Sequence, residues 1–161
     1  MSLPTTTRQY VFPGKIESFN SLTLQEVPLS ALKANEVLVK THAVSLQFRD
    51  LMIASGKYPG NLPRNLVPCS DMAGEVISVG EGVKEWKAGD PVAASFLQDK
   101  LHNDSSGEQG LGGSVQGVLT EYRVFPAQAL VKIPDYLSFE EASTLPCAAL
   151  TAYNTLLSGY G

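Results

Sequence analysis

Few side chains in this chain could act as nucleophiles or metal ligands. It holds two cysteines, Cys69 and Cys147, and two histidines, His42 and His102. No histidine neighbours Cys147 in sequence, so this thiol is interpreted as a small buried residue at a helix start and not as a nucleophile. Two cysteines are also too few for a disulfide framework or a four-cysteine zinc lobe. His42 alternates with apolar residues and is interpreted as structural.

Glycines that could approach a phosphate gather in one segment, Leu97–Gly117, which contains five of them. The run Gly110-Leu-Gly-Gly113 neither follows a strand-like run nor opens a helix, as a dinucleotide-binding turn would. Asp, Asn and Ser fill much of the rest of the segment. The composition therefore predicts a long mobile loop here and not a phosphate site.

Short runs rich in Val, Ile, Leu or aromatic residues, bounded by Gly, Pro, Asn or Asp, are typical of strands. The predicted strands are Arg8–Phe12, Leu22–Val27, Glu36–Ser45, Gly74–Val79, Pro91–Ala94, Thr120–Val124 and Leu130–Ile133. Within 36–44 apolar side chains recur at about every second position, as in a strand with one face on a core. One helix is predicted from about Phe48 to Ser55, with Gly56 at its expected stop. Many short strands with few helices predict an antiparallel barrel or sandwich.

The C-terminal part of the chain reads as helical. Ser138-Phe-Glu-Glu141 has the pattern of a capping box at a helix N-terminus. Pro146 breaks this helix and suits the first turn of a second one, which runs to about Leu157. The sequence thus predicts a mainly β domain over 1–137, followed by a helical segment over 138–161.

Composition limits the partners that are expected. Lys and Arg total 12 against 16 Asp and Glu, which gives a net charge of −4, and no basic block could follow a phosphate backbone. No nucleic-acid partner is therefore expected. No stretch reaches the roughly 18 apolar residues of a membrane span, and no targeting pattern is visible, so we expect a soluble, cytoplasmic protein without a membrane partner.

Two stretches of sequence carry a specific family likeness. The first includes Ala43–Leu51, Gly56–Pro59, Leu66–Val83 and Trp86–Val92, and the second joins Leu119–Val124 to Thr144–Tyr153. Together they resemble the N-terminal domain of the medium-chain dehydrogenase/reductase superfamily, which contains zinc alcohol dehydrogenases and zinc-free quinone oxidoreductases. The likeness implies a GroES-like, partly open antiparallel β-barrel that supplies the substrate side of a cleft. It also implies a dinucleotide-binding Rossmann domain beyond Gly161, so we expect the chain to be truncated before that domain.

The family likeness allows the zinc positions to be compared one by one. The cysteine, histidine and cysteine that hold the catalytic zinc in one branch match Gln47, Ser70 and Cys147 here. One soft ligand cannot retain zinc, which takes about four donors and prefers thiolate or imidazole. Asp71, at the position of a family glutamate, would add only one carboxylate. The resemblance therefore predicts a domain without catalytic or structural zinc.

Without a metal Lewis acid, a conjugated carbonyl compound is a more tractable substrate than a simple alcohol. In a quinone, enone or enoyl thioester, hydride reaches the β-carbon while charge spreads onto an enolate that hydrogen-bond donors stabilise. Ser45-Leu-Gln-Phe-Arg-Asp50 resembles the zinc-free branch, which usually has Asn where Gln47 stands. Gln keeps the amide donors and adds one methylene. The resemblance implies NADPH or NADH as the cofactor of the full-length family member.

Three residues are candidates for the site, each with a functional and a structural interpretation. Gln47 faces the substrate or nicotinamide, or it satisfies local backbone groups. Tyr58 resembles a tyrosine that lines the cleft in quinone reductases and would orient substrate or donate a proton, or it packs in its turn. Thr151 resembles a threonine beside the nicotinamide, or it is an ordinary helix residue. Arg49 and Asp50 are interpreted as a structural pair that anchors the helix.

The sequence therefore predicts the catalytic-domain part of a zinc-independent, NAD(P)H-dependent oxidoreductase that reduces a quinone, enone or enoyl substrate. The alternative is a truncated, catalytically silent GroES-like module that acts as an interaction protein or has no function. Cofactor binding by this chain alone is not expected, because dinucleotide affinity comes largely from a glycine-rich turn at a helix N-terminus. Apolar side chains of the last helix are expected to promote self-association.

Overall fold

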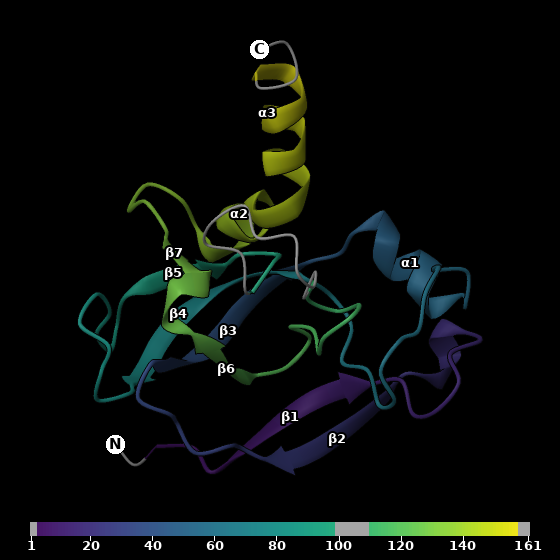
Figure 1. Ribbon diagram of the computed structural model, residues 1–161, viewed down its shortest axis with the longest axis horizontal. Helices are drawn as coiled ribbons and strands as arrows, with labels where there is room; N and C mark the ends of the chain where they lie inside the picture. The colour runs from purple at the N-terminus through teal and green to yellow at the C-terminus, as the bar shows by residue number, and fades with distance from the viewer. Residues whose placement is uncertain (1–2, 99–109, 158–161) are drawn as a thin grey trace.

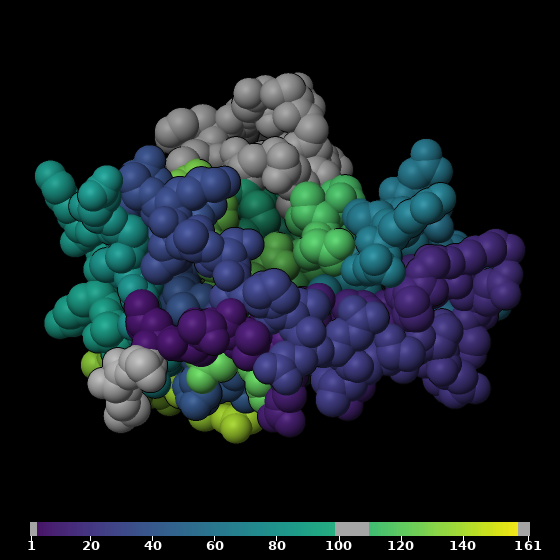
Figure 2. Space-filling view, turned by 90° about the horizontal axis from the view of Figure 1, so that it is seen from below, coloured from purple at the N-terminus to yellow at the C-terminus, as the bar shows by residue number. Residues whose placement is uncertain are grey.

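The computed structural model describes residues 3–98 and 110–157, and antiparallel strands make up most of it (Figure 1). Five strands form the larger sheet, in the order β6-β3-β4-β5-β7. A separate two-stranded ribbon pairs β1 (Thr6–Val11) with β2 (Thr23–Pro28). Seen from below, this ribbon crosses the underside of the molecule (Figure 2). The curved, unclosed arrangement is the partly open antiparallel barrel that the sequence predicts.

The larger sheet contains the remaining five predicted strands, and the ends of several are shifted by a few residues. Its strands are β3 (Glu36–Ser45), β4 (Asp71–Val79), β5 (Pro91–Ala94), β6 (Tyr122–Pro126) and β7 (Leu130–Lys132). β4 begins earlier than the predicted Gly74, because the polar residue Asp71 already pairs with Ser45 at the end of β3. β6 begins later than the predicted Thr120, because Thr120 instead forms an isolated bridge with Gln9 of the ribbon.

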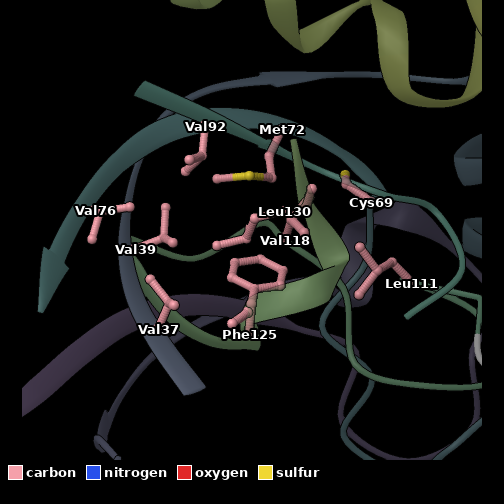
Figure 3. Packing of buried hydrophobic residues seen from close by; sticks show 12 residues of the cluster. Val37, Val39, Cys69, Met72, Val76, Val92, Leu111, Val118, Phe125 and Leu130 are labelled. Atoms are coloured by element: carbon pink, nitrogen blue, oxygen red, sulfur yellow. The ribbon is translucent and has the colours of Figure 1, made fainter. Parts of the chain in front are cut away.

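The hydrophobic core fills the concave side of the larger sheet (Figure 3). The fully buried ring of Phe125 from β6 lies among side chains of the neighbouring strands. Those strands contribute Val37, Val39, Met72, Val76 and Val92, all fully buried. Burial of each such side chain stabilises the fold by roughly 1.5–3 kcal/mol. The alternation within β3 is therefore the signal of this core face, as the sequence predicts.

The segment predicted as a long mobile loop, Leu97–Gly117, lies partly outside the described residues, which resume at Gly110. From there the chain is packed and not loose. Leu111 is fully buried, and its N–H donates to the carbonyl oxygen of Phe96 at 3.1 Å. Gly112 has a φ of +65°, and a Cβ at this position would lie 2.4 Å from the carbonyl oxygen of Cys69. Glycine is used here for close backbone approach, because a larger residue would clash.

The predicted helices are confirmed. α1 (Phe48–Ala54) ends before Gly56, whose φ of +68° suits a helix C-terminus. α2 (Phe139–Ser143) begins with the predicted capping box, in which the Glu141 N–H donates to the Ser138 hydroxyl at 3.2 Å and the Ser138 N–H donates to the Glu141 carboxylate at 2.9 Å. A π-helical segment, η3 (Leu145–Ala149), then leads into α3 (Leu150–Leu157). Pro146 lies in the first turn of η3, where the missing N–H costs nothing.

α3 projects away from the larger sheet (Figure 1). None of its residues is buried, and its large apolar side chains are exposed by 60% to 69%. These side chains are Leu150, Tyr153, Leu156 and Leu157. Among the described residues, no helix is long and apolar enough to cross a membrane. The apolar face of α3 therefore lies in water unless another surface covers it.

We expect the exposed face of α3 to cause self-association of the chain. Replacing Leu156 and Leu157 together by Lys introduces charge into the face without touching a buried residue, so it should shift the protein towards monomer. Sedimentation velocity of the wild type and of the double variant, at several concentrations, measures the change. A matched control is Leu24→Lys on β2, which is 52% exposed and lies on the ribbon. A wild type that is monomeric throughout would contradict the prediction.

Candidate active site

A pocket of about 660 Å³ lies between one edge of the larger sheet and the helical segment. β5, β7 and the residues that follow them form one wall, and η3 and α3 form the other. Most lining residues are apolar, including Phe96, Ile133 and Leu150, while Cys147 and Thr151 contribute from the helical wall. Pockets of this size, with apolar walls and a few polar groups, are typical of small-molecule sites.

The helical wall of this pocket is fixed by a buried carboxyl group. Asp71, the first residue of β4, is fully buried and accepts the backbone N–H of Cys147 at 2.7 Å. It also accepts the hydroxyl of Ser70. Cys147 lies in the first turn of η3, where backbone N–H groups have no partner within the helix, and Asp71 supplies one. In the described part of the chain, no other hydrogen bond ties Leu145–Leu157 to the sheet.

Burial dominates the electrostatics around Asp71. Desolvation raises the pKa of Asp71, although the hydrogen bonds from Ser70 and Cys147 oppose the shift. Desolvation also raises the pKa of Asp50, which is only 8% exposed. The pKa values of the Cys69 and Cys147 thiols are raised as well, first by burial and then by the nearby aspartates. Both cysteines are therefore thiols at neutral pH, and neither is an activated nucleophile.

Cys147 differs in one respect from its interpretation as a buried residue. Its side chain is half-buried and lines the pocket, whereas Cys69 is almost fully buried in the core. The reason is that η3 lies over the edge of the sheet and not inside it. Thr151, one turn further on, is exposed and lines the same pocket. The structure thus places one of the three predicted site residues in the pocket wall.

Gln47 lies at the junction of β3 and α1 and not in the pocket wall. Its backbone N–H donates to the Asp50 carboxylate at 2.8 Å, and its side-chain amide donates to the hydroxyl of Ser45 at 3.2 Å. Ser45 pairs with Asp71 across β3 and β4. The positions that match the family's zinc ligands, Gln47, Ser70 and Cys147, are therefore gathered around one end of these two strands.

Tyr58 is half-buried beside α1 and packs against a small apolar cluster that includes Ile53 and Leu66. The guanidinium carbon of Arg49 lies 5.8 Å from the centre of its ring and 4.9 Å from the ring of Phe96. Tyr58 is absent from the lining of the 660 Å³ pocket, but Phe96 is part of it. A line of contacts therefore connects Tyr58 to the pocket through Arg49 and Phe96.

Arg49 and Asp50 both anchor α1, as expected, and the charge of Arg49 opposes the rise in the pKa of Asp50 that burial causes, but no direct ion pair joins them among the described residues. The two side chains anchor α1 in separate ways. Arg49 donates to the carbonyl oxygen of Leu111, which fastens the helix to the turn after Gly110. Asp50 accepts the N–H of Gln47 and caps the helix N-terminus, where a negative charge is favourable.

Two functional positions escape sequence reasoning. Asp71 offers only one carboxylate to a metal, and the sequence signal for its structural role is its place at the start of a strand, just before the apolar pair Met72-Ala73. A carboxylate there needs a partner, because an isolated buried charge is costly. Phe96 has no such signal, because its contact with Arg49 joins residues far apart in the chain.

The donors in this region do not fit a zinc ion. Among the described residues, no group of three or more His, Cys, Asp or Glu side chains is placed to hold a metal. Gln47 and Ser70 offer neutral oxygens or amide hydrogens, and both oxygens of Asp71 already accept hydrogen bonds. The raised pKa of Cys147 opposes the thiolate that zinc requires.

A curved antiparallel sheet that carries a helical segment over a ligand-sized pocket defines a GroES-like domain of the oxidoreductase type. Residues 33–135 match the family model described as the alcohol dehydrogenase GroES-like domain. The match covers more than half of the chain, and the chain belongs to this family.

Relatives with known names support the same assignment. A zinc-type alcohol dehydrogenase-like protein of Schizosaccharomyces pombe is 43% identical over 152 residues, which is 92% of this chain and 44% of that protein. A chloroplast envelope quinone oxidoreductase homolog of Arabidopsis thaliana is 38% identical, over 84% of this chain and 37% of that protein. The structure of acetophenone reductase from Geotrichum candidum in complex with NAD superposes with a TM-score of 0.83 at 27% identity, over 98% of this chain and 49% of that one. The chain thus spans less than half the length of each.

The raised pKa of Asp71 predicts how stability changes with pH. Because the folded pKa lies above the unfolded value of about 3.9, the contribution of Asp71 is fully present below that value and is lost as pH rises through the folded pKa. The wild type should therefore lose stability relative to Asp71→Asn as the pH rises above about 4. Urea unfolding, followed by the fluorescence of the single Trp86, measures the difference.

Asp135→Asn, at an exposed loop position, is the matched control. The difference in free energy of unfolding between this variant and the wild type should not show the change expected for Asp71→Asn. A wild type that gains stability relative to Asp71→Asn on going from acid to neutral pH would show that the carboxylate form is the favoured one.

The donor set predicts that the purified chain holds far less than one zinc per molecule. The double variant Gln47→Cys, Ser70→His should bind about one zinc, because the two new ligands join Cys147 at the end of β3 and β4. Elemental analysis after dialysis measures both. The control variant Gln47→Ser, Ser70→Ala changes the same positions without adding ligands. One tightly held zinc in the wild type would overturn this prediction, and a double variant that binds none would show that the three positions do not converge as a ligand set.

Proposed function

We infer that this chain forms the substrate-side domain of a zinc-independent, nicotinamide-dependent oxidoreductase that reduces a conjugated carbonyl compound. The observation that carries the proposal is the donor set at the end of β3 and β4. The Gln47 amide donates there to Ser45, which pairs with Asp71, and the Ser70 hydroxyl and the Cys147 backbone N–H donate to the Asp71 carboxyl group. The other nearby carboxyl group, that of Asp50, accepts the N–H of Gln47. Amide and hydroxyl donors stabilise an enolate by hydrogen bonding more readily than they hold a Lewis acid.

The substrate class follows from this chemistry. A quinone, an enone or an enoyl compound accepts hydride at carbon and develops negative charge on oxygen, which hydrogen-bond donors stabilise. The relatives include a quinone oxidoreductase homolog and several alcohol dehydrogenases, so the choice of a conjugated carbonyl compound over a simple alcohol is based on the donor set. In the proposal, the amide of Gln47 and the phenol of Tyr58 are the donors that act on the substrate oxygen.

NADPH or NADH supplies the hydride when bound. Among the described residues, Thr151 fits a place beside the nicotinamide, because its exposed side chain lines the pocket on the helical wall. The reductase that superposes on this chain was solved with NAD, which supports a nicotinamide cofactor. The Gly110–Gly113 turn does not serve the pyrophosphate in this proposal, since Gly112 packs against the backbone of Cys69.

The proposal is tested by joining this chain to the C-terminal half of the Schizosaccharomyces pombe relative and measuring NADPH and NADH oxidation with an enone and a quinone. We expect turnover that is unaffected by EDTA. Tyr58→Phe should lower kcat roughly a hundredfold, because it removes a proton donor, whereas Tyr136→Phe, on an exposed loop, should have no effect. Gln47→Leu should also lower kcat, because it removes the amide donors.

Three outcomes would count against this function. Turnover that EDTA abolishes would indicate metal chemistry. Equal kcat values for Tyr58→Phe and Tyr136→Phe would show that Tyr58 packs in its turn and donates no proton. A folded fusion that binds NADPH but reduces neither substrate would favour the alternative, a catalytically silent module. The chain by itself should show no cofactor oxidation and no NADPH binding at micromolar concentration, which fluorescence titration measures.

A further inference from the structure

We propose that Arg49 is a positioning residue of the candidate site, whose planar guanidinium group holds the rings of Tyr58 and Phe96 in a fixed relation to each other. Tyr58 carries the phenol that donates a proton in the function proposed above, and Phe96 belongs to the pocket lining. The inference rests on that proposed function, because it explains how the donor and the pocket wall of the same site keep one geometry.

Contacts from separate parts of the chain converge on Arg49. Its guanidinium carbon lies 5.8 Å from the centre of the Tyr58 ring and 4.9 Å from that of Phe96, both within the range of cation–π interactions. The guanidinium group also donates to the carbonyl oxygen of Leu111. The N–H of Leu111, which is fully buried, donates in turn to the carbonyl oxygen of Phe96 at 3.1 Å. Arg49 therefore contacts the ring of Phe96 directly and is linked to its backbone through Leu111.

Two glycines of the run Gly110-Leu-Gly-Gly113 make room for these side chains. A Cβ at Gly110 would lie 2.8 Å from the Cζ atom of Phe96, and a Cβ at Gly113 would lie 2.8 Å from the Nη1 atom of Arg49. A larger residue at either position would push one of the two side chains away. The glycine-rich run, which resembles no phosphate site, thus has a role in seating the ring of Phe96 and the guanidinium group of Arg49.

The planar shape of the guanidinium group is needed here as well as its charge. An arginine can stack on rings and donate to a carbonyl oxygen at the same time, whereas the ammonium group of lysine is a compact point charge. Burial raises the pKa values of Asp71 and Cys147, and the charge of Arg49 is one of the influences that oppose this rise. Arg49→Lys keeps the charge and loses the stacked contacts, so it separates the two roles.

The contacts are tested in the chain itself by the aromatic NMR signals of Tyr58 and Phe96, assigned with Tyr58→Phe and Phe96→Leu. Arg49→Lys should shift the signals of both rings, whereas Arg8→Lys, which changes an exposed arginine on the ribbon, should shift neither. If Arg49→Lys does not fold, Gly113→Ala decides, because its methyl group meets only the flexible end of the Arg49 side chain and should shift both signals. Signals of either ring that stay unchanged would overturn the proposal.

The positioning role is tested by a double-variant cycle in the fusion protein described above. Arg49→Lys should lower kcat about tenfold, because a displaced phenol loses its alignment with the substrate oxygen. In the Tyr58→Phe background it should lower kcat no further, because no phenol remains to be positioned. It should raise KM in both backgrounds, because Phe96 still lines the pocket. A general loosening of α1 would instead lower kcat by the same factor in both backgrounds, and that result would overturn the proposal.

These outcomes separate the two proposals. If the wild-type fusion protein reduces neither substrate, the proposed function fails, and the NMR signals still decide whether Arg49 holds the two rings. If the fusion protein is active and Tyr58→Phe lowers kcat but Arg49→Lys does not, the proposed function stands and the positioning role of Arg49 fails.

Discussion

The buried carboxyl group of Asp71 joins the start of β4 to the first turn of η3, and the position of the pocket's helical wall depends on it. It accepts the N–H of Cys147 in the first turn of η3 and the hydroxyl of Ser70 on its own strand. α3 exposes every residue and gains little from apolar burial, so its direction depends on this hydrogen bond and on α2, whose Ala142 packs against Ala73 and Ile133. The pocket exists because the helical segment is held over the sheet edge at that point.

Burying the carboxyl group of Asp71 costs desolvation free energy, and the backbone next to it is also strained. Desolvation raises the pKa of Asp71, and the hydrogen bonds it accepts oppose that shift. Cys69, two residues earlier, adopts a φ of +68°, a strained conformation for a residue other than glycine. Gly112 and Gly117 lack the Cβ atoms that would clash with Cys69, so the neighbouring turn can pack against it. Strain, burial and close glycine contacts are concentrated beside the candidate site, which is typical of functional regions.

In the function proposed above, the same region sets this domain apart from the zinc branch of its family. The fold still brings the three ligand positions to the end of β3 and β4, although only Cys147 has kept a metal-binding side chain. Asp71 has become a structural partner of the helix. The site therefore offers hydrogen-bond donors and an apolar pocket, which suits a substrate whose charge can spread over a conjugated system.

The sequence by itself determined what local patterns encode: the alternation of β3, the capping box at Ser138 and the stop at Gly56. These depend on a few neighbouring residues, so they can be read along the chain. Tertiary structure alone decided which distant groups meet. Cys147 reaches Asp71 across 76 positions, and the resulting pocket takes in Thr151 but leaves Gln47 and Tyr58 outside its wall. Strand register and the packing of the helical segment over the sheet edge set these contacts, and no short stretch of sequence contains both partners.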